Sequence, residues 1–60
     1  MRLAVNFGLL EDALDVIDEV NEVSKKQGQV VISLACLQAE MSIRTILTLL
    51  RKFRVENKEE

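Results

Sequence analysis

The second half of the chain contains a regular pattern of apolar residues that is typical of an α-helix. Seven apolar residues advance by four and three positions in turn: Ile32, Cys36, Ala39, Ile43, Ile46, Leu50 and Phe53. Such alternation marks a seam along one side of a helix. At about 100° per residue, a second apolar ladder lies almost opposite this seam; it consists of Val30, Leu34, Leu37 and Met41. One neighbouring helix cannot cover both sides, so the pattern predicts a further packing partner.

The first half predicts a helix that is apolar on one side only. Apolar residues recur at helical spacing from Leu9 to Val23, and charged residues occupy the other faces. Asn6 and Gly8 are alternative caps for its start, and Gly28 follows two lysines as a stop. We therefore predict a helix over about 8–27, a turn at about 28, a second helix over about 29–55 and a short charged tail.

The length of the chain limits how it can be stabilised. A domain of 60 residues folding alone buries only about 60% of the surface that its unfolded chain exposes. Cys36 is the only cysteine and there is no histidine, which excludes an intrachain disulfide and the commonest zinc sites. Partner chains remain as the source of additional burial.

The short turn at Gly28 forces the two helices to be antiparallel neighbours. The predicted fold class is all-α: an antiparallel two-helix hairpin that assembles into a four-helix bundle or a larger helical oligomer, with residues 1–60 as a single helical-hairpin domain. The apolar N-terminal residues could fold back over the end of the longer second helix. We expect these residues at the oligomer interface: Val30, Leu34, Leu37, Met41, Ile43, Leu50 and Phe53.

The net charge, the long apolar stretch and the N-terminal residues indicate where in the cell the protein is expected. The chain carries a net charge of −2, which provides no overall basic field for nucleic acid or membrane. Residues 30–50 have roughly the length of a membrane span, but Glu40 and Arg44 would each cost about 2.5 to 3.5 kcal/mol near mid-bilayer. The N-terminus is a poor secretory signal because acidic residues soon follow it. We expect a cytoplasmic protein without a membrane span.

No catalytic, metal-binding or cofactor-binding pattern is recognisable. Cys36 has no histidine to act as its general base, and the sequence lacks a glycine-rich phosphate loop. The carboxylates from Glu11 to Glu22 lie mostly on the outer side of the first helix, without the histidine that carboxylate metal sites in helical bundles use. We expect no enzymatic activity, no metal and no cofactor.

The expected function is a non-enzymatic protein-protein interaction or oligomerisation module, a small adaptor or regulator that acts as a homo-oligomer. A different protein that supplies the missing surface is the alternative partner. The acidic side of the first helix and the basic end of the second are each a possible further contact surface. The candidate contacts, to a partner or to nucleic acid, are the bases Arg44, Arg51, Lys52 and Arg54, which also complement the helix dipole.

The alternative function is a nucleic-acid-binding regulator, although we do not expect nucleic acid as a partner. Residues 2–7 alternate, with Leu3, Val5 and Phe7 on one side, which is the period of a strand. A strand followed by two helices resembles the ribbon-helix-helix repressors by the order of elements, and the resemblance implies paired strands in the DNA major groove. A helical-hairpin dimer is also similar in architecture to plasmid RNA-binding regulators.

Overall fold

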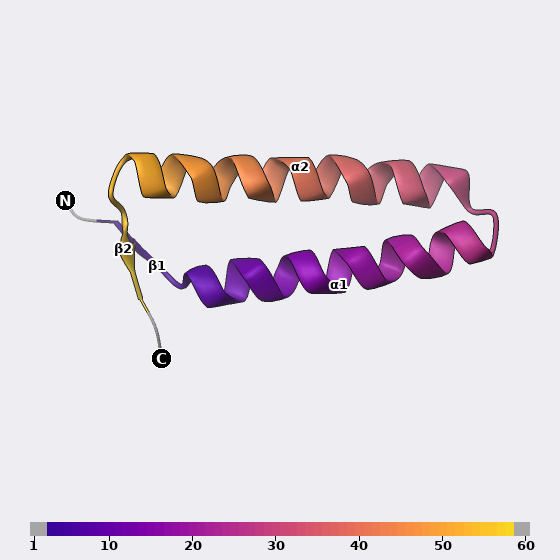
Figure 1. The fold of residues 1–60 in the computed structure, drawn as a ribbon, viewed down its shortest axis with the longest axis horizontal. Coiled ribbons are helices and arrows are strands. Elements are labelled where there is room, and N and C mark those ends of the chain that lie inside the picture. The colour runs from indigo at the N-terminus through magenta and orange to yellow at the C-terminus, as the bar shows by residue number, and fades with distance from the viewer. Residues whose placement is uncertain (1–2, 59–60) are drawn as a thin grey trace.

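The computed structural model describes residues 3–58, which form four elements. They are β1 (Ala4–Val5), α1 (Phe7–Lys26), α2 (Val30–Lys52) and β2 (Glu56–Asn57). The chain is mostly helical, and its two helices run antiparallel and pack against each other (Figure 1). The molecule measures 45 × 21 × 13 Å, and its smallest dimension is close to the diameter of one helix, about 10–12 Å. The two helices therefore form a single layer.

The two helices end in the same way. In α1, Gln29 N–H donates to the Ser24 carbonyl at 2.8 Å and Gly28 N–H to the Lys25 carbonyl at 3.1 Å. This pair of bonds is a Schellman motif, which needs a left-handed residue after the helix, and Gly28 supplies it with φ 71°.

In α2 the same two bonds run from Val55 to Leu50 at 2.8 Å and from Arg54 to Arg51 at 3.1 Å. Here the left-handed residue is Arg54, with φ 55°. The helix therefore ends at Lys52, three residues before the predicted end at about 55.

The start of α1 is capped from two directions. Asn6 Oδ1 accepts the Leu9 N–H at 3.2 Å, and Asn57 Oδ1 accepts the Phe7 N–H at 3.1 Å. Asn6 is thus the cap, one of the two alternatives that the sequence offered. A Cβ on Gly8 would lie 3.1 Å from Asn6 Oδ1, so glycine leaves room for this capping side chain.

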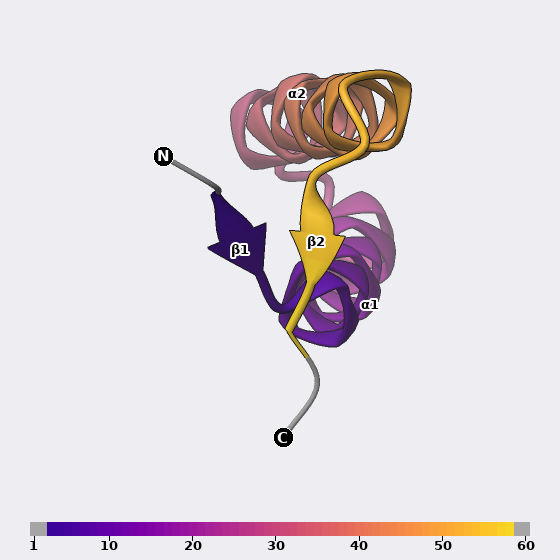
Figure 2. The same ribbon diagram turned by 90° about the vertical axis from the view of Figure 1, so that its left-hand side faces the viewer.

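The predicted charged tail contains a short strand, because residues 56–57 pair with residues 4–5 near the N-terminus. β1 and β2 are parallel, with Ala4 opposite Glu56 and Val5 opposite Asn57. Figure 2 shows them side by side at the open end of the two helices. Lys58 N–H extends the ladder by donating to the Val5 carbonyl at 2.8 Å. This small parallel pair also departs from the all-α expectation.

The contact between the helices follows one seam on each, and we call these two lines the inner seam. On α1 it consists of Leu10, Leu14, Ile17, Asn21 and Ser24; on α2 it consists of Ser33, Cys36, Glu40, Ile43, Leu47 and Leu50. All of these residues are buried or half-buried. Within residues 3–58, the buried apolar residues are Cys36 and Leu47, and the buried polar ones are Asn21 and Ser24.

The inner seam of α2 corrects the seam predicted from the sequence. Of the predicted residues, Cys36, Ile43 and Leu50 do lie on the inner seam, whereas Ile32 and Ile46 are exposed by 47% and 44%. The sequence pattern merged two adjacent lines, because apolar residues cover a wide arc of this helix. The chain ends do not cover Phe53 either, which is 71% exposed.

Candidate docking face

Each helix carries a second line of residues beside the inner seam, displaced from it by one position toward the N-terminus. On α1 this line is Leu9, Ala13, Val16, Val20 and Val23; on α2 it is Ile32, Ala35, Ala39, Ser42, Ile46, Leu49 and Phe53. Both lines advance by three and four residues, as a packing seam does. We call the two lines together the apolar face; its one polar member is Ser42.

The two halves of the apolar face lie on the same side of the molecule. An open groove of about 350 Å³ between the helices contains residues from both lines. Its lining is entirely apolar: Val16, Ile17, Val20, Val31, Ile32, Ala35, Cys36 and Ala39. The apolar face is therefore continuous across the layer. Most of its large side chains are close to or above half exposed, with Val16 at 59% and Leu49 at 45%.

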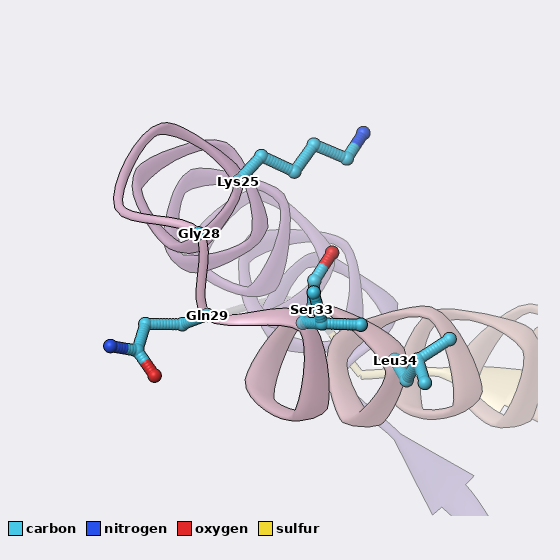
Figure 3. A pocket seen from close by; sticks show the side chains of 6 residues that line it. Lys25, Gly28, Gln29, Ser33 and Leu34 are labelled. Atoms are coloured by element: carbon cyan, nitrogen blue, oxygen red, sulfur yellow. The ribbon is translucent and has the colours of Figure 1, made fainter.

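The apolar ladder predicted as the oligomer interface lies on the other side of α2. Its four residues are all exposed: Val30, Leu34, Leu37 and Met41. A smaller hollow near the turn is lined by Lys25, Gly28, Gln29 and Ser33 together with the first two ladder residues (Figure 3). In Figure 3 the Leu34 side chain lies on the near side of α2, at the edge of this hollow.

The seven predicted interface residues thus do not form one surface. The ladder is on one side of α2, and Phe53 belongs to the apolar face on the other. Ile43 and Leu50 are half-buried on the inner seam, so α1 of the same chain already packs against them. Sequence reasoning did not find the exposed line of α1, because that helix was expected to bury a single side.

A polar contact lies inside the inner seam near the turn. Ser33 Oγ donates a hydrogen bond of 2.6 Å to Asn21 Oδ1, and Asn21 is only 3% exposed. A buried asparagine at a seam position fixes the register between helices, at some cost in stability. This pair was not predicted from the sequence, although the spacing of Asn21 from Ile17 places it on the inner seam.

Three of the four predicted basic contact residues, Arg51, Lys52 and Arg54, lie at or just after the open end of α2, and they do not form a purely basic surface. Arg51 is paired with Glu11 of α1, with 3.6 Å between nitrogen and oxygen. Lys52 Nζ lies 5.9 Å from the centre of the Phe53 ring. Arg44 lies about two turns before Arg51 and is exposed. Arg54 is committed to the left-handed position that ends α2.

Two further findings concern the chemistry of the surface. In the part of the chain that the structure describes, no group of three or more histidine, cysteine, aspartate or glutamate residues could hold a metal ion. By length and composition α2 could cross a membrane, and 6% of its most apolar part is buried in the structure. Comparisons with protein-family models, curated proteins and solved structures found no match to this chain.

Proposed function

We propose that this chain is a non-enzymatic oligomerisation module, a small adaptor or regulator in which two helical hairpins pair through the apolar face to form a four-helix bundle. The observation that carries the proposal is the continuous apolar face on a layer only one helix thick. A layer of this kind has no second layer of its own to bury the face, and folded domains are built from at least two packed layers.

The exposed surface area of the chain is larger than that of a compact monomer, by about the area that one partner buries in a dimer. The chain exposes 4997 Å², whereas a compact monomer of its mass exposes about 4,000 Å². The excess of about 1,000 Å² is close to the roughly 800 Å² that each partner buries in an interface of standard size. The radius of gyration of 13.8 Å likewise exceeds the value of about 10 Å for a compact domain of this length.

A location in the cytoplasm is part of the proposal. Cys36 is a free cysteine with no second one in the chain, as is common in reducing compartments. Glu40 lies half-buried toward α1, and Arg44 follows one turn later. Two charges within α2 are costly in a bilayer and cost little in a soluble bundle.

The test compares two substitutions in α2 of the same kind, one on the apolar face and one on the ladder on the other side of the helix. Ile46 on the apolar face and Leu37 on the ladder are exposed by 44% and 42%. Each would be changed to aspartate, and the molar mass in solution would be measured by sedimentation over a dilution series. The wild type is expected at twice the chain mass of 6.8 kDa.

We expect Ile46→Asp to weaken the dimer at least about a hundred-fold, because both copies lose a buried isoleucine and gain a buried charge. Leu37→Asp should retain the dimer. A wild type that stays monomeric and helical at all concentrations would contradict the proposal. So would loss of the dimer in Leu37→Asp alone, which would move the interface to the ladder, or wild-type protein found only in membranes.

A further inference from the structure

The side chains of the apolar face differ in size from one end of α2 to the other. This difference limits the orientations in which a second copy can pack on the face. On α2, the half near the turn contains Ala35 and Ala39, and the open half contains Ile46, Leu49 and Phe53. The groove of about 350 Å³ lies over the first half. One half of the face is therefore hollow, and the other half carries large side chains.

Two identical faces can meet in two symmetric ways. If the two-fold axis runs along the helices, the turn of one copy lies over the turn of the other, and α1 lies over α2. If the axis crosses the helices within the plane of contact, the turn of one copy lies over the open end of the other. In that second arrangement α1 lies over α1 and α2 over α2. Both are isologous pairs, in which each copy uses the same surface.

The spacing of the line on α2 is nearly symmetric about Ser42. Its members lie three, seven and ten residues before Ser42 and four, seven and eleven residues after it, with both alanines before Ser42 and only large side chains after it. Placed antiparallel on a second copy, the line pairs Ala39 with Ile46, Ala35 with Leu49 and Ile32 with Phe53, while Ser42 meets itself. Each alanine thus faces a large side chain, which fills space without overlap.

The line on α1 has the same property about Val16. In the antiparallel arrangement Ala13 faces Val20, Leu9 faces Val23, and Val16 meets its own copy. Val16 and Ser42 lie 12 and 14 residues from Gly28 at the turn, so their heights along the layer differ by about 3 Å. A single two-fold axis can therefore pass through both central pairs.

The other arrangement packs the face less well. With turn over turn, valines would also lie over alanines, Val16 over Ala39 and Val20 over Ala35, but the groove of one copy would lie over the groove of the second, so that the two hollows would face each other. Side chains that line a void lose contacts with packing partners. Phe53 would have no residue of α1 opposite it, because α1 begins only at Phe7.

We propose that a second copy of this chain covers the apolar face with its turn over the open end of the first, and that the two-fold axis passes Val16 and Ser42. This arrangement deepens the proposed function and rests on it. It places Glu19 of one copy near Asp12 of the second at the outer edge of α1. Both side chains are exposed, so salt screens their repulsion and is expected to tighten the dimer.

Cysteine cross-linking tests the arrangement in the full chain. Ser42→Cys and Val16→Cys each place a thiol beside its own copy on the proposed axis, and a disulfide needs Cα atoms about 4.4–6.8 Å apart. We expect each single variant to form a covalent dimer under mild oxidation. The wild type, whose Cys36 is buried within the chain, sets the background, and Leu37→Cys on the ladder is the matched exposed control.

The outcomes separate this inference from the proposed function. If neither single variant cross-links but an equimolar mixture of the two does, the copies lie turn over turn. The orientation is then wrong while the dimer stands. If sedimentation finds a dimer but only Leu37→Cys cross-links, both the orientation and the choice of the apolar face are wrong. Cross-linking by both single variants, stronger at 150 mM salt than at 10 mM, supports the orientation.

Discussion

The residues that follow α1 and α2 occupy equivalent positions, but one is glycine and the other is arginine. Exchanging the residue type should therefore change the free energy of unfolding in opposite directions at the two positions. Gly28 and Arg54 both adopt left-handed backbone conformations, with φ 71° and 55°. A residue with a side chain pays about 1–2 kcal/mol in this region, and replacing it by glycine loosens the unfolded chain by about 0.4–1 kcal/mol. We expect Arg54→Gly to raise the free energy of unfolding by about 0.5–1 kcal/mol, the difference between these terms.

The reverse change, Gly28→Ala, should lower the free energy of unfolding by about 1 kcal/mol. Nothing lies within 4 Å of a Cβ built on Gly28, so the loss comes from the backbone and not from a clash. For a domain of this size 1 kcal/mol corresponds to about 4–8 °C in Tm. Thermal unfolding followed by circular dichroism measures both variants, at one fixed protein concentration because dimer stability depends on it.

Gln27→Gly provides the matched control. Gln27 precedes the left-handed residue and has φ −94°, where glycine gains no steric relief and costs about 0.5–1 kcal/mol. If Arg54→Gly destabilised the protein as much as Gln27→Gly does, Arg54 would not hold a strained backbone, and the account of how α2 ends would be wrong.

Two further predictions concern contacts that the sequence did not reveal. Asn57→Ala removes a hydrogen-bond acceptor from the first turn of α1, so we expect a loss of about 0.5–2 kcal/mol in the same thermal assay; an unchanged Tm would mean that β2 is not docked on α1. A double-mutant cycle of Asn21→Ala and Ser33→Ala should give a coupling of about 0.5–1.5 kcal/mol in urea unfolding; additive effects would contradict their 2.6 Å hydrogen bond.

Several features of the fold could be predicted from the sequence because they depend on residues close together in the chain. Asn6 was one of two predicted caps, and it caps α1. Gly28 was predicted to end the first helix and does so through its positive φ. The predicted helix bounds differ from the observed ones by one residue at three of the four ends. Local backbone preferences and hydrogen bonds decide such features.

The end of α2 and the pairing of β2 with β1 could not be predicted from local backbone preferences. Arg54 is not a residue type that favours the left-handed region, and its conformation accompanies the half-buried position of Val55. β2 pairs with a strand more than 50 residues earlier in the chain. β1 lies within residues 2–7, whose alternation has the period of a strand, but no pattern in the two residues of β2 marks them as its partner, so the pairing itself becomes visible only where the two chain ends meet.

The sequence by itself determined that α2 has more apolar surface than one neighbour can cover, because that follows from the spacing of its apolar residues at 100° per residue. Which of those residues face α1 was decided only by the tertiary structure. Adjacent lines on a helix differ by a rotation of about 100°, and an apolar arc this wide tolerates more than one choice. Asn21 of α1 and Ser33 of α2 are hydrogen-bonded on the inner seam, where Ser24 and Cys36 are also buried, and this choice of seam leaves the apolar face on the outside.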